Sequence, residues 1–385
     1  MKSRMTRRQF SGTCIGGAVL ASPLSRAATS PRAEPFSFVL LGDLHFDKLE
    51  HHDMDWLQKN HAGDVNQVRN YSRITKEVHP SLFATVRETI ANRKAATGSP
   101  IPFVIHAGDL VEGLCGNEKR AMQQDMEAVE FVQGANLGVP FLFTKGNHDV
   151  TGPGAADAFK GVLRPFLAKQ ASSFGSGKLE NDCFAIEHCD AQFCFFDAYD
   201  NASLDWLEAT LARRTARRCF VIVHPPVVPY GARSTWHIYS SERDKPRRER
   251  LLELLGQHHA IVLGGHIHKY NLLTRVTPGP RSGKFVQLGV SSIISKPDAV
   301  TAKDTLFGVD RYNGDQIKVE PNFSPATEHE RRAVYDAEAP FVKEFQYADL
   351  PGYAVVTVTS ERVAATIFSG TSRQLWRTVE LAGPA

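Results

Sequence analysis

The sequence predicts a layered α/β fold, in which helices cover β-sheets. Two observations predict it: short apolar runs typical of strands alternate with helical stretches, and helices give out after Lys269, where strand candidates dominate. Such alternation is typical of α/β layers. With 385 residues, 42% of them hydrophobic, the chain can bury a large core, as soluble globular proteins do.

The strand candidates share short runs of apolar residues. They are residues 36–41, 101–106, 140–144, 184–187, 193–196, 220–223, 261–263, 284–289, 353–359 and 362–368. Several of them are separated by helical stretches. These are residues 81–94, 118–133, 155–169, 204–213 and 247–255. The polar and charged stretch 313–349 is expected to form a surface loop.

The first 30 residues have the layout of an export signal. A basic start precedes an apolar stretch from Gly12 to Leu24, and small residues follow it. The adjacent Arg7 and Arg8 resemble a bacterial twin-arginine signal, which export machinery recognises on folded proteins. We therefore expect residues 1–30 to be cleaved and the protein to be periplasmic or secreted. The alternative is a disordered basic leader with a chance arginine pair.

Removal of the leader changes the charge balance. The whole chain carries a net charge of +3, but residues 1–27 contain five basic residues and no acidic ones. The remaining 40 basic and 42 acidic residues give about −2, which argues against a stable nucleic acid partner. Arginine and lysine clusters at 213–218 and 245–250 are interpreted as solvated faces. No stretch approaches the roughly 20 apolar residues that a membrane span needs.

Five segments carry residues that suit metal binding and catalysis, and four of them directly follow a strand candidate. The segments read VLLGDLHFD, VIHAGDLVEG, LFTKGNHDV, VIVHPP and VLGGHIH. Their polar residues are Asp43, His45, Asp109, Glu112, Asn147, His148, Asp149, His224, His266 and His268. In open α/β sheets, ligands bind at the carboxyl ends of the strands, so these residues are expected to converge.

The residue types indicate two divalent metal ions rather than one. Two aspartates, one asparagine and four or five histidines are too many ligands for one tetrahedral zinc. Oxygen and nitrogen donors without thiolate suit manganese, iron, zinc or nickel. Each histidine alone has a plainer interpretation as a hydrogen-bonded turn or core residue. In an extended segment, the spacing of His266 and His268 would turn both rings to one side.

Taken together and in order, the motifs DLH, GDLVE, GNHD, H and GHIH resemble those of the calcineurin-like metallophosphoesterase family. The resemblance covers residues 43–268 and implies a four-layer α/β/β/α sandwich with a small β-rich C-terminal extension. It implies one ion held by Asp43, His45, Asp109 and His268. It implies a second ion held by Asp109, Asn147, His224 and His266, with Asp109 bridging the two.

The resemblance also implies a reaction. A hydroxide that bridges the metals attacks the phosphorus of a phosphate mono- or diester, and His148 acts as the general acid. Glu112 matches the position of an acidic partner for His148, although it also fits an exposed loop acid. The substrate would be a phosphorylated small molecule or a phosphodiester. The alternative function is a metal-containing protein that binds phosphorylated ligands without turnover.

The motif positions suggest three parts of the chain: the signal, a metallophosphoesterase domain over 35–310, and a β-rich extension over 311–385. The connection at 47–80 is longer than a simple crossover needs and is expected to form a cap over the site. The alternative is a surface helical insertion. A third metal at His51, His52 and Asp53 is a weaker possibility. Residues 229–241, including Arg233, Trp236 and His237, are a second candidate for the substrate rim.

Overall fold

The computed structural model describes residues 34–97, 100–175, 179, 182–231, 237–279, 282–316 and 325–383. The predicted export signal therefore lies outside the described residues. None of the described helices combines the length and the apolar character that crossing a lipid bilayer requires.

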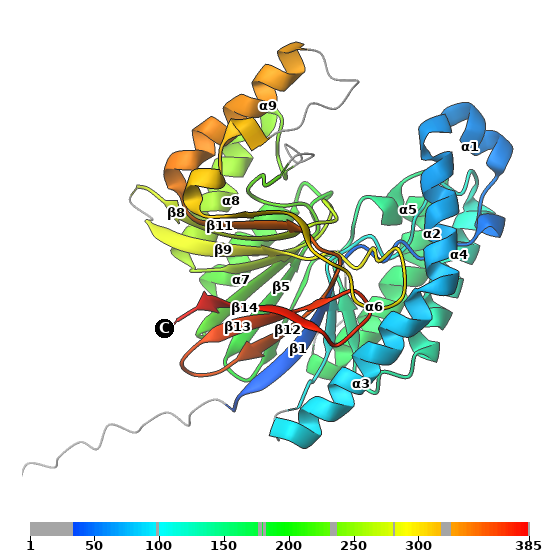
Figure 1. Cartoon of the computed structure of the whole chain (residues 1–385), viewed down its shortest axis with the longest axis horizontal. Helices are drawn as coiled ribbons and strands as arrows, with labels where there is room; N and C mark the ends of the chain where they lie inside the picture. Colours follow the sequence, from blue (N-terminus) through cyan, green and yellow to red (C-terminus); the bar gives the residue numbers. More distant parts are fainter. Residues whose placement is uncertain are drawn as a thin grey trace, which may run out of the picture. The chain divides into compact units, whose positions relative to one another are not determined.

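Two β-sheets form the centre of residues 33–385, which are one compact unit (Figure 1). The six-stranded sheet has the order β14-β13-β12-β1-β2-β3. Its strands are β1 (Phe36–Leu41), β2 (Val104–His106), β3 (Phe141–Phe143), β12 (Gly352–Val358), β13 (Val363–Ser369) and β14 (Leu375–Ala382). β1, β2 and β3 are mutually parallel, whereas β12 pairs antiparallel with β1.

The eight-stranded sheet has the order β10-β11-β8-β9-β7-β6-β5-β4. Its strands are β4 (Phe184–His188), β5 (Ala191–Phe196), β6 (Arg218–Val223), β7 (Ile261–Gly264), β8 (Tyr270–Thr277), β9 (Gly283–Gly289), β10 (Lys303–Phe307) and β11 (Val342–Asp349). The run β5-β6-β7-β9 is parallel. Both sheets therefore present carboxyl ends of parallel strands, as the positions of the motifs require.

The two sheets pack face to face through aromatic rings. Phe38 of β1 meets Phe193 of β5 and Phe220 of β6 edge-on, with ring centroids 5.4 and 5.5 Å apart. Phe103 also meets Phe193 edge-on at 5.1 Å. These edge-to-face contacts add to the burial of large apolar side chains, so they fix how the sheets stack.

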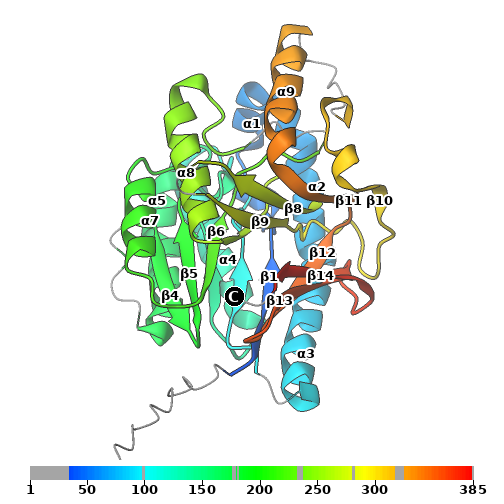
Figure 2. The same ribbon diagram turned by 90° about the vertical axis from the view of Figure 1, so that its left-hand side faces the viewer.

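Helices cover the outer faces of the sheets (Figure 2). The helices are α1 (Met54–Asn60), α2 (Val65–Glu77), α3 (His79–Thr97), α4 (Glu118–Gly134), α5 (Ala155–Ala158), α6 (Arg164–Ala171), α7 (Ser203–Ala212), α8 (Lys245–Gln257) and α9 (Pro325–Glu338). α3 buries Leu82 and Phe83 in the core of the six-stranded sheet, and α8 buries Leu251 and Leu255 against the other sheet. The predicted four-layer α/β/β/α fold is confirmed.

Local sequence sets where several helices begin. The Asn117 side chain accepts a hydrogen bond from the Arg120 amide at the start of α4, and Asp53 accepts one from the Trp56 amide at the start of α1. Such caps satisfy amides that have no partner within the helix. The cap on α4 fixes the end of the loop that carries Asp109 and Glu112.

The stretch 313–349 was expected to be a surface loop, and this prediction is wrong. It contains α9 and the whole of β11, which pairs with β8 and β10 inside the eight-stranded sheet. The alternating polar residues of β11 reflect an antiparallel strand with one solvated side. The strands after residue 310 thus join both sheets, and the domain boundary at 310 stays a prediction.

One buried ion-pair network ties α9 to the eight-stranded sheet. Glu338, which is 4% exposed, accepts hydrogen bonds from Arg248 Nη2 at 2.8 Å and Arg275 Nε at 2.7 Å. Burial alone would raise the pKa of Glu338, but the two arginines outweigh it and lower the pKa below its ordinary value. The pair therefore stabilises the fold only while Glu338 is ionised.

We expect Glu338→Gln to lower the free energy of unfolding at pH 7 by about 3 kcal/mol, because the variant leaves the buried Arg275 and the partly buried Arg248 without a charged partner. The wild-type advantage is complete above the pKa of an unfolded glutamate, about 4.3, and shrinks as the pH falls toward the lower folded pKa. Urea unfolding at pH 7 and pH 3.5 measures both effects. Asp336→Asn, at an exposed position of the same helix, is the control; a loss that is equal at both pH values would contradict the ion-pair explanation.

Candidate metal centre

The candidate site lies where the parallel strands of both sheets end. Asp43 and His45 follow β1, Asp109 follows β2, and Asn147 and His148 follow β3. From the other sheet, His224 follows β6, while His266 and His268 follow β7. All predicted site residues therefore come from five loops at one end of the sandwich.

Five of these residues have a left-handed backbone. The φ angles are +54° for Asp43, +47° for His45, +55° for Asp109, +72° for His266 and +60° for His268. Non-glycine residues with positive φ are uncommon, and such strain gathers at functional sites. The spacing of His266 and His268 had suggested an extended segment. Their positive φ angles show that neither residue is extended.

Backbone hydrogen bonds between loops hold these conformations. The amide of Asp43 donates to the Gly108 carbonyl at 3.2 Å, and the amide of His45 donates to the Asp109 carbonyl at 2.9 Å. The amide of His266 donates to Asp43 Oδ1 at 2.6 Å. The loop after β1 is thus tied to the loops after β2 and β7.

One cluster consists of Asp43, His45, Asp109 and His268. Each offers a ligand atom, and these atoms all lie within 4.8 Å of one another. His45 Nε2 is 3.2 Å from His268 Nε2 and 3.6 Å from Asp109 Oδ2, and His268 Nε2 is 3.8 Å from Asp43 Oδ1. These are the four residues that the motif resemblance assigns to one ion.

A second cluster consists of Asp109, His224 and His266. His224 Nε2 lies 2.9 Å from Asp109 Oδ2, 3.1 Å from His266 Nδ1 and 3.2 Å from Asn147 Oδ1. His224 Nδ1 donates to the Ala107 carbonyl at 2.8 Å, since a carbonyl can only accept. Nε2 is then the atom of His224 that is free to bind a cation.

The donor sets fit divalent cations. With bonds of about 2.0–2.1 Å in a tetrahedral site, two imidazole nitrogens would lie about 3.3 Å apart, close to the distances in both clusters. Asp43 Oδ2 is buried, and none of the described residues forms a hydrogen bond with it. A cation would satisfy this oxygen, which is otherwise costly to bury.

The electrostatics of the histidines also suit metal binding. Burial lowers the pKa of His45 and of His266 to about 3, and it lowers that of His268 well below its ordinary value. These rings are therefore neutral and keep a lone pair for a ligand bond. Burial would also lower the pKa of His224, but Asp109 raises it to about 9, so a cation at Nε2 would have to displace a proton.

The two carboxylates of the clusters differ in pKa. Burial raises the pKa of Asp43 to about 7. Burial acts on Asp109 in the same direction, but His224 and His148 outweigh it and hold its pKa well below the ordinary value. Asp109 is thus a stable anion between the clusters.

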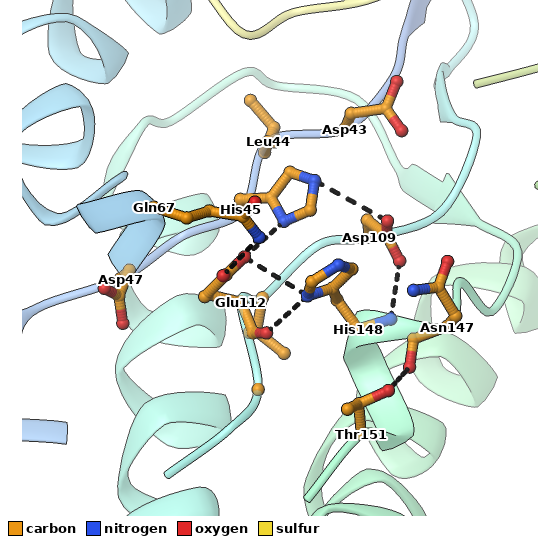
Figure 3. Close-up of polar contacts among 12 residues, drawn as sticks. Asp43, Leu44, His45, Asp47, Gln67, Asp109, Glu112, Asn147, His148 and Thr151 are labelled. Atoms are coloured by element: carbon orange, nitrogen blue, oxygen red, sulfur yellow. Dashed lines mark hydrogen bonds and ion pairs between the residues drawn. The ribbon is translucent and has the colours of Figure 1, made fainter. Parts of the chain in front are cut away.

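His148 and Glu112 form a polar contact next to the first cluster (Figure 3). His148 Nδ1 donates to the Glu112 carbonyl at 2.8 Å and lies 3.3 Å from Glu112 Oε2. Burial would lower the pKa of His148, but the charges of Glu112 and Asp109 raise it to about 9. His148 is therefore cationic at neutral pH, and its Nε2 proton is not the one that bonds the Glu112 carbonyl.

Glu112 is completely buried, so its interpretation as an exposed loop acid is wrong. Its Oε2 accepts from His45 Nδ1 at 2.7 Å, which is closer than its contact with His148, and its Oε1 accepts from Gln67 at 2.9 Å. Burial raises its pKa above the ordinary value, and the neighbouring His148 cation opposes this rise. Glu112 thus orients two histidines at once.

Glycines allow the loops to approach each other. A Cβ atom at Gly146 would lie 2.1 Å from Asp109 Oδ1, and one at Gly265 would lie 2.7 Å from Asp43 Oδ2. One at Gly108 would lie 2.6 Å from His224 Nδ1. Each distance is shorter than side chains tolerate, so these positions require glycine.

Asp149 connects two of the loops. Its Oδ2 accepts from the amides of Asp109 at 3.2 Å and Gly146 at 2.7 Å, and its Oδ1 accepts from the Val111 amide at 3.1 Å. A carboxylate that accepts several backbone amides fixes their relative positions. Asp149 therefore holds the loop of Asp109 against the loop of Asn147.

The 47–80 insertion packs directly on the site. The Tyr71 ring of α2 stacks on His45 with centroids 4.4 Å apart, and Gln67 of the same helix donates to Glu112. No sequence motif links α2 to the loops of His45 and Glu112. The sequence therefore did not predict that Tyr71 and Gln67 contact these two residues. The insertion stabilises the ligand loop, while its role as a cap stays a prediction.

A third metal at His51, His52 and Asp53 is not supported by the structure. His52 Nε2 lies 2.7 Å from Asp47, His51 Nε2 lies 3.1 Å from Glu127, and Asp53 caps α1. Within the described part of the chain, no group of potential metal ligands includes these three residues.

Residues 229–241, the second candidate for the substrate rim, belong only in part to the described residues. Arg233 and Trp236 lie outside the described residues, and His237 is 8% exposed.

A different aromatic residue, Tyr199, is 42% exposed on the loop after β5. Only its place after a strand could have marked it in the sequence.

Comparison with known families gives a match to the model of calcineurin-like phosphoesterases over residues 36–270. The chain belongs to this family. The matched residues are more than half of the chain and contain every motif described above. The family is described as one of phosphoesterases, and the candidate ligands suit divalent metal ions. Compared with curated protein sequences, the chain has no significant match.

Solved structures with a similar fold include a purple acid phosphatase from seeds of yellow lupin, Lupinus luteus. It has a TM-score of 0.51 and 13% identity, covering 91% of this chain and 54% of the lupin chain. PhoD has a TM-score of 0.48 and 13% identity, covering 92% and 73%. A dimetal phosphatase from Danio rerio has a TM-score of 0.48 and 14% identity, covering 91% and 100%. The chain thus spans about half of the lupin protein, and this likeness concerns the fold alone.

We expect Gly146→Ala to reduce metal affinity about 10- to 100-fold, because the added methyl group would displace the Asp109 carboxylate. Isothermal titration with manganese measures the affinity. Gly134→Ala is the matched control, since a Cβ there meets nothing within 4 Å. Equal manganese affinity in both variants would contradict a ligand role for Asp109.

Proposed function

We propose that the protein is an exported phosphoesterase that hydrolyses a phosphate mono- or diester at two divalent metal ions. The observation that carries the proposal is the convergence of two donor clusters that share Asp109, beside a cationic histidine. Manganese, iron, zinc or nickel would suit the oxygen and nitrogen donors. The membership of a phosphoesterase family supports the same reaction.

In this proposal, Asp43, His45, Asp109 and His268 hold one ion, and Asp109, Asn147, His224 and His266 hold the other. When bound, two such ions supply Lewis acidity toward the phosphoryl oxygens and lower the pKa of water toward neutrality. The protein residues supply the rest. Asp109 faces both clusters through Oδ2, while its Oδ1 accepts from the His148 amide at 2.8 Å, so it sets the spacing between ligand loops.

His148 is proposed as the general acid. Its Nδ1 proton is committed to the Glu112 carbonyl, so Nε2 carries the proton that it can give to the leaving alkoxide. The negative surroundings that raise its pKa to about 9 keep this proton in place at neutral pH. Glu112 and Gln67 hold the ring in position and contact no substrate in this proposal.

The substrate would enter on the side of the partly exposed histidines. The His148 side chain is 18% exposed and that of His268 is 26% exposed, whereas Asp43, His45 and His224 are buried. The exposed ring of Tyr199, on the loop after β5, offers an apolar and hydrogen-bonding surface to a substrate. Which ester binds there depends on the rim rather than on the metal ligands.

We expect His148→Ala to lower kcat about 10²- to 10⁴-fold for esters with poor leaving groups. The loss should be much smaller for p-nitrophenyl esters, because p-nitrophenolate departs without a proton. Hydrolysis of phenyl and p-nitrophenyl phosphate mono- and diesters with manganese measures this difference. His329→Ala, at an exposed histidine of α9, is the control.

Two outcomes would oppose the proposal. An equal loss of kcat for both leaving groups would argue against the acid role of His148. An absence of turnover for every ester, with two metals bound per chain, would favour the alternative, a protein that binds phosphorylated ligands without hydrolysis.

Export of the protein to the periplasm or medium is part of the proposal and rests on the leader sequence. Arg7, Arg8 and the apolar stretch that follows support recognition by export machinery. We expect replacement of both arginines by lysine to leave unprocessed precursor in the cytoplasm. Cell fractionation with N-terminal sequencing measures this, and normal processing of the double variant would contradict a twin-arginine route.

A further inference from the structure

A cavity lies at the end of the sandwich opposite the metal centre. It has a volume of about 910 Å³ and is lined by β14 on one side and by the first residues of β6, β7 and β9 on the other. Small-molecule sites usually measure about 300–1,000 Å³, so the cavity has room for a metabolite.

The cavity is distant from the candidate metal centre along the strands. β6 begins at Arg218, which lines the cavity, and His224 follows the last residue of the same strand. Six strand residues at about 3.3 Å each separate the two by about 20 Å. A ligand in the cavity therefore would not contact the metal ligands.

Basic side chains predominate in the lining. Arg214, Arg217, Arg218, Lys284 and Arg377 all contribute to the wall. Two carboxylates, Glu344 and Glu380, also line it. Glu344 already accepts hydrogen bonds from Thr274 and Gln346. The cavity thus carries an excess of positive charge, which favours an anion.

Arg218 is the least expected of these residues. It is only 7% exposed, and its Nη1 donates to the Gly383 carbonyl at 2.9 Å. Its Nε and Nη2 are buried without a hydrogen-bond partner, and among the described residues it forms no ion pair with a carboxylate. Burial and then Arg217 lower the pKa of its guanidinium.

A buried and unpaired guanidinium is costly, since buried charges are normally paired or bound to a ligand. The sequence had suggested a solvated face for 213–218, and for Arg218 this interpretation is wrong because β6 begins there. An anion in the cavity would supply the charge partner that Arg218 lacks among the described residues.

We propose that this cavity is a binding site for a phosphorylated small molecule, whose phosphate group compensates the charge of Arg218 and whose body packs on the apolar wall. Val286, Ile261 and Leu381 provide that wall. Arg214 and Lys284 add charge around the phosphate position. The proposal is independent of the proposed hydrolysis, because it requires no metal and no turnover.

Inorganic phosphate is the probe, and the metal-loaded full chain is titrated by isothermal calorimetry. We expect wild type to bind phosphate at the cavity in addition to any binding at the metals. Arg218→Met should weaken the cavity binding at least about tenfold, because it removes a positive charge that the phosphate would compensate. Arg213→Met is the matched control, because it removes the same charge from an exposed neighbouring position outside the cavity.

Identical titrations for wild type and Arg218→Met would overturn the proposal, and so would a wild type without binding beyond the metals. Unchanged ester hydrolysis in Arg218→Met separates this site from the metal centre. If Arg218→Met does not fold, Lys284→Met, at the exposed rim, replaces it. Weaker phosphate binding by that variant supports the proposal, and unchanged binding overturns it.

Discussion

The Asp109 carboxylate is the interaction on which the site depends. One of its oxygens faces histidines from both clusters, and the other accepts a hydrogen bond from the His148 amide. Its backbone is left-handed, and Asp149 and Gly146 support it from the next loop. Because it joins the loops of the six-stranded sheet to His224 of the other sheet, the sandwich itself determines the spacing of the donors.

The surrounding charges give each histidine a different state. The rings of His45, His266 and His268 are neutral, because burial outweighs the nearby carboxylates. His148 and His224 are cationic, because Asp109 and Glu112 outweigh burial. Neutral histidines that can bind a metal therefore lie close to His148, which can donate a proton. The difference follows from which carboxylate each ring faces, and not from its position in the sequence.

The parts of the structure that the sequence predicted are those set by local patterns. Short apolar runs marked β1, β5, β6 and β7, and the polar residues directly after such runs marked every member of the two clusters. Their assignment to particular ions stays a prediction. The pattern also implied a layered fold, because parallel strands require helices between them.

The missed features depend on contacts between distant segments. β11 alternates polar and apolar residues because only one of its sides is buried, and its partners β8 and β10 lie far away in the sequence. The stacking of Tyr71 on His45 and the bond from Gln67 to Glu112 join α2 to loops more than 20 residues away. Arg218 resembles its exposed neighbours in sequence, and only the start of β6 buries it.

The most direct measurement is a crystal structure of the manganese-loaded protein with anomalous scattering from the metal. We expect two peaks about 3.5–4 Å apart, one on each side of Asp109. One peak should contact His45 and His268, and the other should contact His224 and His266. A single peak, or two peaks that do not share Asp109, would contradict the dinuclear centre.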